Sequence, residues 1–228
     1  MTTQPIKLDI MSDPICPWCF IGKRRLERAL RARPDVEFQL GWRPFQLNPE
    51  IPRSGVSRAH YLSTKFGGNS RAQRIYENIA ASGLEEGLAF NFKAIRHQPN
   101  TVDSHRLVRW AASTGKQDAV VEALFLAYFM DGRDVGDHDV LVDIAARAGM
   151  DGDTVRDLFT RDADRDLVLA EEGVARRMGI AGVPCFIIDR KYAVSGAQDP
   201  SVLTNVIDLA LKDRSPAKVQ AAEEAAGV

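Results

Sequence analysis

The sequence predicts an α/β protein in which a βαβ unit and an αββα unit are separated by a large all-helical insertion. Three observations lead to this fold class. Strand-like alternation brackets one helical stretch in the first 43 residues, helical spacing dominates the middle of the chain, and strand-like runs return after residue 182. Because 45% of the 228 residues are apolar and 27% are charged, the chain has the composition of a globular protein with a substantial core.

The first unit is predicted to be a strand, a helix and a second strand. Residues 6–10 alternate apolar and polar side chains at period two, as expected for a strand with one buried face. A helix is expected to begin at Pro17, which a first helical turn tolerates, and to end before Pro34. Residues 36–43 alternate again, which completes the βαβ unit.

A change of period marks the insertion. Residues 44–55 are expected to form a loop, since three prolines remove backbone donors there. Apolar residues then recur three or four positions apart, between Gly or Asp-Gly breaks, in predicted helices at 58–66, 71–82, 102–114, 117–130, 138–148, 153–160 and 164–178. Thr101 and Asp137 precede two of these helices and are expected to cap them.

The last part of the chain returns to strands. An apolar run at 183–188, a turn and a second strand at 192–194 predict a hairpin at the edge of a mixed sheet. Asp199-Pro200 then begins an amphipathic helix, with the aspartate as N-cap. The predicted organisation is a discontinuous α/β domain of residues 1–57 and 165–212, a helical insertion of residues 58–164 and a loosely docked tail of residues 213–228.

Composition and charge argue against several classes of function. Thirty Lys and Arg residues against 31 Asp and Glu residues leave a formal charge of -1, so no overall field favours nucleic acid or an anionic membrane. No run approaches the roughly 18 apolar residues of a membrane span. Three cysteines are too few for a secreted disulfide framework, and the first residues lack the basic and apolar regions of a signal peptide. If the chain is the complete gene product, it is expected to be cytoplasmic.

The stretch Cys16-Pro17-Trp18-Cys19 lies just after the first strand and opens the first helix. This spacing allows the second thiol to attack a disulfide formed by the first, and a helix N-terminus stabilises a thiolate. The same spacing is half of a zinc site, but only Cys185 and an unspecified histidine are available as further ligands. A redox dithiol is therefore expected, and no metal site.

Three separated motifs resemble one family. SDPICPWCFIG at residues 12–22, NTVDSHRL at residues 100–107 and YAVSGAQ at residues 192–198 are similar to motifs of the cytoplasmic FrnE-like members of the DsbA-like branch. The βαβ and αββα units with their insertion resemble the thioredoxin superfamily, and the likeness covers nearly the whole chain except the tail. It implies a thioredoxin-like fold and the activity of a thiol-disulfide oxidoreductase or isomerase, most narrowly a protein-disulfide oxidoreductase.

The resemblance also implies roles for the two cysteines. Cys16 would be the nucleophile at the N-cap or first position of the helix, and Cys19 the resolving thiol. Because Cys19 lies on the apolar face of the helix, it is expected to be more buried and less acidic than Cys16. No bound cofactor is expected. Glutathione or a dithiol reductant would be the redox partner, and a disulfide- or thiol-containing protein or small molecule the substrate.

Four further residues are expected to support the dithiol. In the superfamily the inter-cysteine pair, here Pro17 and Trp18, helps to set the reduction potential. Trp18 cannot pair ionically with a thiolate as a histidine would, so a less oxidising enzyme than periplasmic DsbA is expected; the side chain should be partly exposed. Pro184 is similar to the superfamily's cis-proline, which faces the dithiol and lets the backbone of Val183 pair with an extended substrate.

Two groups of residues have alternative interpretations. A polar cluster at a helix start contains Asn100, Thr101, His105 and Arg106. It either helps to choose the substrate, as the resemblance suggests, or provides capping and surface charge; a further alternative for His105 is a buried histidine with satisfied hydrogen bonds. Cys185 is either a buried structural cysteine at the start of a core strand or a third sulfur within reach of Cys16.

Two other functions share this layout. Kappa-class glutathione transferases and 2-hydroxychromene-2-carboxylate isomerases have the same helical insertion, so a glutathione-dependent enzyme of this kind is the main alternative. These relatives typically carry a serine in place of Cys16 and lack the second cysteine, and the intact pair therefore argues against them. A module that only binds extended peptides would tolerate loss of Cys16, and this property separates it from an enzyme.

Overall fold

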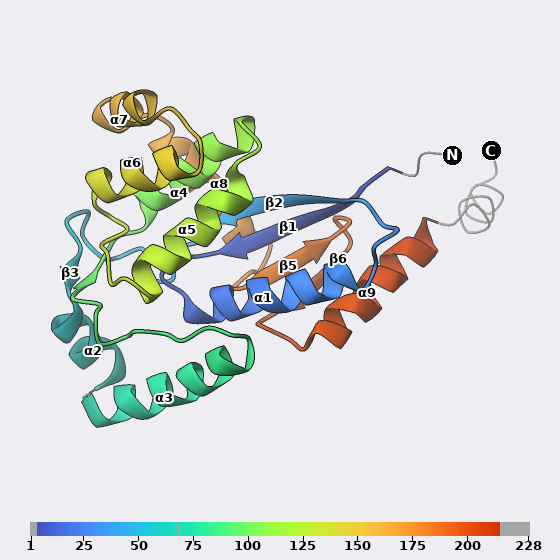
Figure 1. The fold of residues 1–228 in the computed structure, drawn as a ribbon, viewed down its shortest axis with the longest axis horizontal. Coiled ribbons are helices and arrows are strands. Elements are labelled where there is room, and N and C mark those ends of the chain that lie inside the picture. Colours follow the sequence, from blue (N-terminus) through green and yellow to red (C-terminus); the bar gives the residue numbers. More distant parts are fainter. Residues whose placement is uncertain (1–3, 68, 215–228) are drawn as a thin grey trace.

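A four-stranded mixed sheet forms the centre of the molecule (Figure 1). The computed structural model describes residues 4–67 and 69–214. The sheet order is β2-β1-β5-β6, with β1 parallel to β2, and with β5 antiparallel to both β1 and β6. The strands are β1 (Ile6–Ser12), β2 (Phe38–Pro44), β5 (Cys185–Ile188) and β6 (Tyr192–Ser195). This confirms the α/β class, the initial βαβ unit and the hairpin at the sheet edge.

Helices cover the sheet and form the insertion. The described residues contain α1 (Pro17–Arg31), α2 (Arg58–Phe66), α3 (Asn69–Glu85), α4 (Val102–Ser113), α5 (Gln117–Phe129), α6 (His138–Arg147), α7 (Gly152–Thr160), α8 (Arg165–Arg177) and α9 (Pro200–Asp213). Every helix predicted from periodicity is present, with its ends displaced by three residues at most. Helix α1 packs against α9, and α8 packs against β2 and α4.

The two faces of β5 separate two apolar clusters. Phe186 and Ile188 belong to the main core together with residues of α1, α5 and α9. Cys185 points to the other face and packs with Met11 and with Ala175 of α8. Because side chains alternate along a strand, this division places the sheet between α1 and α9 on one side and α8 on the other.

A second, two-stranded sheet was not predicted. Strand β3 (Val56–Ser57) pairs antiparallel with β4 (His97–Gln98), about forty positions further along the chain. A strand of two residues is too short to show the alternation of apolar and polar side chains, so the sequence pattern does not predict either strand. This pairing holds the start of α2 close to the segment that leads into α4.

Helix caps agree with the sequence in part. The Asp137 and Asp199 side chains accept from the first amides of α6 and α9, as predicted. Thr101 is the N-cap residue of α4, as predicted, but its side chain makes no capping bond. Instead the Asn100 side-chain oxygen accepts from the Val102 amide at 3.0 Å.

The start of the predicted C-terminal tail is tightly held. Asp213 is the last residue of α9, and the Arg214 guanidinium binds the Asp189 carboxylate, with an Nε to Oδ2 distance of 2.7 Å. Loose docking was therefore wrong for the first two residues of the tail, and its remainder, 215–228, lies outside the described residues. The division into an α/β domain and an insertion stays a prediction. Within the described part of the chain, no helix is long and apolar enough to cross a membrane.

Candidate active site

The N-terminus of α1 positions the two cysteines. Cys16 is the N-cap residue, with extended backbone angles of φ -94° and ψ 110°, and Pro17 occupies the first turn. The Cys19 amide donates to the Cys16 carbonyl at 3.0 Å. No side chain caps this end among the described residues, and the first turn holds no acidic residue. The helix dipole therefore favours a negative charge at Cys16.

The cysteines are buried, whereas the residue between them is not. Cys16 is 3% exposed and Cys19 is 1% exposed, while Trp18 is 37% exposed. Burial raises the pKa of the Cys19 thiol well above its ordinary value, and a hydrogen bond with the neighbouring Cys16 side chain raises it further. Cys19 is thus the more deeply buried of the two thiols, as predicted, and its pKa lies above the ordinary value. Trp18 is partly exposed, as predicted.

The loop before β5 closes over Cys16. The Val183-Pro184 peptide bond is cis, as the resemblance implied. The Cys16 thiol donates to the Val183 carbonyl, with an Sγ to O distance of 3.6 Å. On α1, a Cβ atom at Gly22 would lie 2.9 Å from Pro184 Cγ, so only glycine allows this close approach. Gly22 is thus a site-forming residue for which no role was predicted.

Phe20, the residue after Cys19, packs the dithiol end of α1 against the insertion. Its ring stacks on Phe125 of α5 with the centroids 4.9 Å apart and an interplanar angle of 12°. The Phe129 ring lies 6.4 Å from the Phe20 ring, and all three residues are at most 1% exposed. This stack joins α1 to the insertion immediately after Cys19, and it fixes the orientation of the helix end that carries the thiols.

Asp13 is a fully buried carboxylic acid three residues before Cys16. Its oxygens accept from the amides of Leu47 at 2.7 Å and Ile15 at 3.4 Å. Burial raises the pKa of Asp13 to about 7, although those amides and the Thr101 side chain lower it. Asp13 therefore connects the loop after β2 and the start of α4 to the dithiol loop. Its burial has no signature in the sequence, where an Asp-Pro pair also suits an exposed turn.

His105 lies behind Asp13. Its Nε2 atom is 4.0 Å from Asp13 Oδ1 and has no hydrogen-bond partner among the described residues. The ring also bonds to the Phe45 carbonyl, an interaction that leaves Nδ1 as the donor. Burial lowers the pKa of His105 to about 4, so the imidazole is neutral at physiological pH.

The predicted polar cluster at the start of α4 is mostly internal. Thr101 is 2% exposed and His105 is 4% exposed, so neither forms part of a charged surface. Arg106, counted in that surface, is fully buried and binds Asp103 at 2.7 Å. The Asn100 amide nitrogen donates to the Ile51 carbonyl at 2.8 Å. Of the second alternative, helix capping is therefore correct, through Asn100, and surface charge was wrong.

Cys185 is not brought to the dithiol. It is 2% exposed and packs in the cluster on the opposite face of the sheet from the residues around Cys19. Burial raises the pKa of the Cys185 thiol. The packing of Cys185 in a separate cluster thus favours the interpretation as a structural cysteine over that of a third sulfur within reach of Cys16. All three cysteines are free thiols.

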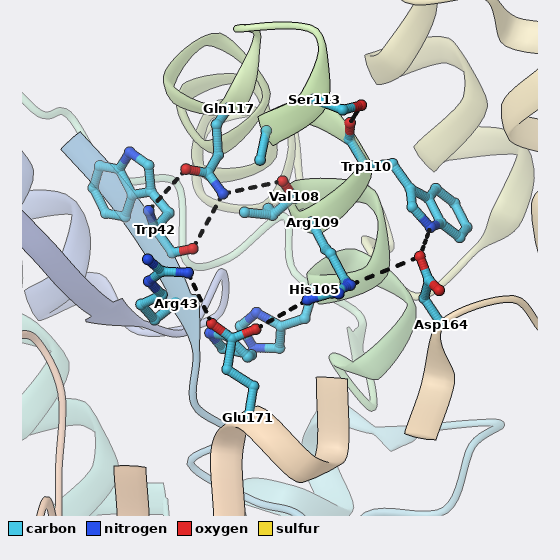
Figure 2. A pocket seen from close by; sticks show the side chains of 12 residues that line it. Trp42, Arg43, His105, Val108, Arg109, Trp110, Ser113, Gln117, Asp164 and Glu171 are labelled. Atoms are coloured by element: carbon cyan, nitrogen blue, oxygen red, sulfur yellow. Dashed lines mark hydrogen bonds and ion pairs between the residues drawn. The ribbon is translucent and has the colours of Figure 1, made fainter. Parts of the chain in front are cut away.

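A pocket of about 360 Å³ is lined by residues of β2, α4 and α8. His105 forms part of its wall (Figure 2). The charged side chains that line this pocket form ion pairs with one another. Glu171 binds Arg43 and Arg109 at 3.1 and 3.3 Å, and Arg109 also reaches Asp164 at 3.7 Å. The dithiol is not part of the lining of this pocket. Within the described ranges, no group of three or more His, Cys, Asp or Glu side chains is arranged to hold a metal ion.

Comparison with known proteins agrees with the fold. A probable DsbA oxidoreductase from Streptomyces coelicolor is 36% identical, with 92% of each chain covered and a TM-score of 0.83. The uncharacterized protein YwbO of Bacillus subtilis is 26% identical over 89% of this chain and 96% of its own length.

Two more distant structures share the fold. The cytosolic disulfide reductase DsbM from Pseudomonas aeruginosa, solved with GSH, has a TM-score of 0.59 at 18% identity, over 90% of this chain and 99% of its own. A 2-hydroxychromene-2-carboxylate isomerase has a TM-score of 0.66 at 14% identity, over 91% and 97%. The family model described as a DSBA-like thioredoxin domain matches residues 7–208. With that match over most of its length, the chain belongs to the family of DsbA-like thioredoxin domains.

Proposed function

We propose that this protein is a thiol-disulfide oxidoreductase in which Cys16 is the nucleophile and Cys19 the resolving thiol. The observation that carries this proposal is the arrangement at the start of α1. There Cys16 occupies the N-cap, its thiol contacts that of Cys19, and the Val183 carbonyl lies 3.6 Å away. Membership of the DsbA-like family supports oxidoreductase chemistry on thiol or disulfide substrates.

The proposed reaction has two exchange steps. The Cys16 thiolate attacks a substrate disulfide, which breaks the substrate S–S bond, releases one thiolate and leaves a mixed disulfide on Cys16. Cys19 then attacks the Cys16 sulfur, releases the second substrate thiol and forms the Cys16–Cys19 disulfide. Two electrons pass from the dithiol to the substrate. The same steps in reverse oxidise a substrate dithiol.

The surroundings of the dithiol have supporting roles in this proposal. Pro17 and Trp18 would tune the reduction potential, and the exposed Trp18 ring would meet the substrate. The backbone at Val183, held by the cis bond to Pro184, would pair with an extended segment of a protein substrate. Glutathione or a dithiol reductant would return the pair to its starting state, and the cytosolic reductase with GSH supports this choice and a cytoplasmic location.

A glutathione-dependent transferase or isomerase is the second candidate. The structural likeness to the 2-hydroxychromene-2-carboxylate isomerase concerns the fold alone. The two adjacent thiols favour the oxidoreductase, because a glutathione-dependent enzyme of that kind does not need a resolving cysteine.

Three single-cysteine variants test the proposal. Turnover of a disulfide substrate is followed with glutathione and glutathione reductase in the assay. Cys16→Ser should abolish turnover, and Cys19→Ser should accumulate a mixed disulfide on Cys16 that mass spectrometry detects. Cys185→Ala is the matched control and should retain activity. Full turnover by Cys16→Ser would refute the proposed function.

A further inference from the structure

Arg58 carries a positive charge that no carboxylate pairs with in the described part of the chain. Its guanidinium donates to the Gln98 side-chain oxygen and lies over the rings of Tyr61 and Tyr76, 5.3 and 5.0 Å from their centroids. Neutral groups therefore hold this half-buried cation in place. A guanidinium has five N–H donors, so donors are left over for a ligand.

A second cation and an orphaned amide lie on the other side of Tyr61. Lys65 Nζ donates to the Asn48 side-chain oxygen at 2.9 Å, and Lys65 forms no ion pair with any described residue. Asn48 is only 4% exposed, yet its Nδ2 atom has no hydrogen-bond partner among the residues that the structure describes. The Asn48 side chain also interacts with the Tyr61 hydroxyl, and Arg58 covers the Tyr61 ring.

This group of donors lies next to the dithiol. Tyr76 hydrogen-bonds to Arg58, and its pKa is raised first by burial and further by the nearby Cys16, while Arg58 lowers it. Leu47, the neighbour of Asn48 in the chain, donates its amide to Asp13 Oδ2 at 2.7 Å, and the Cys16 amide donates to the Asp13 carbonyl at 2.9 Å, so these donors adjoin the dithiol loop. Charge at Asp13 likewise acts on Tyr61, which places the second tyrosine close to the same loop.

The adjoining surface has room for a small molecule. A pocket of about 330 Å³ is lined by Tyr61 and Lys65 together with apolar side chains of Ile51, Pro52 and Val56. Glu50 also lines the pocket, but it makes no ion pair with Lys65 in the described residues. The pocket combines an apolar wall with the Lys65 ammonium and the Tyr61 hydroxyl, which is the usual composition of a small-ligand site. Arg58 and Asn48 do not line the pocket themselves but adjoin it, through the Tyr61 ring and through Lys65.

We propose that Arg58, Lys65 and Asn48 form a carboxylate-binding subsite for small disulfides whose carboxylate lies a few bonds from the sulfur. The buried Asn48 donor without a partner costs free energy, the half-buried Arg58 has no carboxylate partner among the described residues, and the exposed Lys65 adds a second positive charge; a carboxylate can interact with all three. The planar Arg58 fork matches the two oxygens of a carboxylate, and the Tyr61 and Tyr76 rings hold it in position. This inference rests on the proposed function, because it names the class of substrate for the same dithiol.

Small disulfides of similar length and different charge provide the test. The substrates are 3,3′-dithiodipropionate with two carboxylates, bis(2-hydroxyethyl) disulfide without charge, and cystamine with two ammonium groups. Cys16 attacks one sulfur and releases one thiolate, Cys19 displaces the second thiol, and glutathione in the assay reduces the resulting disulfide.

The variant Arg58→Gln should lower kcat/KM for dithiodipropionate by about tenfold or more and change the value for the neutral disulfide less than about twofold. Lys65→Gln should act in the same direction, and Arg58→Lys should keep part of the preference. Arg31→Gln is the matched control. It removes the same charge from the far end of α1, where the side chain is exposed, and should leave kcat/KM unchanged for both substrates.

An equal loss on all three substrates would overturn the subsite, because Arg58 would then act on the thiolate or on the fold. An unchanged preference for dithiodipropionate would overturn it as well. Binding of 3,3′-thiodipropionate, a thioether that cannot exchange, separates this inference from the proposed function. NMR titration compares the binding of this thioether with that of neutral 2,2′-thiodiethanol. If the protein prefers the thioether dicarboxylate and a folded Arg58→Gln variant loses this preference, the subsite is supported even if turnover fails. Binding that persists refutes it.

Discussion

Asp13 and His105 should give the protein two opposing pH dependences of stability. Burial raises the pKa of Asp13 from 3.8 to about 7, so the folded protein keeps a proton that the unfolded chain releases above pH of about 4. Since one pKa unit corresponds to about 1.4 kcal/mol, this group lowers the free energy of unfolding by about 4 kcal/mol as the pH rises from about 4 to about 7.

His105 acts in the opposite direction. Burial lowers its pKa from 6.5 to about 4, so the unfolded chain binds a proton below pH of about 6.5 that the folded protein does not. The free energy of unfolding therefore rises by about 3 kcal/mol between pH of about 4 and about 6.5. In the wild-type protein the two contributions largely cancel in this window.

Single substitutions separate the two contributions. Relative to wild type, Asp13→Asn should gain about 4 kcal/mol of unfolding free energy as the pH is raised from about 4 to about 7.5. His105→Gln should lose about 3 kcal/mol relative to wild type over the acidic part of this range. Glu172, whose charge acts on both groups, is present in every protein compared and cancels.

Urea unfolding of the reduced proteins at a series of pH values measures these differences. The stability of Asp13→Asn relative to wild type is the decisive quantity. If it stayed constant within about 1 kcal/mol across the range, Asp13 would have an ordinary pKa and the burial argument would be refuted.

Three further substitutions test how the site is built. Gly22→Ala places a Cβ atom 2.9 Å from Pro184 Cγ and should destabilise the protein by about 1 to 2 kcal/mol and slow disulfide turnover; wild-type turnover would show that the loop moves freely. Phe20→Ala removes a ring stacked 4.9 Å from Phe125 and should lower the free energy of unfolding by about 3 to 5 kcal/mol in a denaturant titration. Cys185→Ala should cost about 1 kcal/mol of stability and leave the reduction potential of the dithiol unchanged, and a shifted potential would contradict its placement on the other face of the sheet.

Local spacing was sufficient to predict most of the fold and the centre of the site. The helices of the insertion follow from apolar residues three or four positions apart, and Asp137 caps α6 as its position suggests. Cys16 and Cys19 could be recognised because their spacing and their place between a strand and a helix are local properties. The cis bond at Pro184 followed from the resemblance and not from the residues themselves.

Long-range contacts account for what the sequence did not predict. The β3–β4 pair has only two residues in each strand, and its register depends on the packing of the whole insertion. Asp13, His105 and Arg106 are residue types that usually remain exposed, and only the assembled interface between the dithiol loop and α4 buries them. The position of Arg58 over two tyrosine rings likewise depends on α2 and α3 packing together.

The redox equilibrium of Cys16 and Cys19 tests the central claim most directly. The protein is equilibrated in buffers of graded glutathione composition, alkylated, and its cysteine-containing peptides are weighed by mass spectrometry. We expect a reversible change between two free thiols and one Cys16–Cys19 disulfide, with a two-electron dependence on the buffer potential and with Cys185 alkylated throughout. Failure to form this disulfide at any buffer composition, with Cys16 either unreacted or bound only to glutathione, would contradict the proposed function.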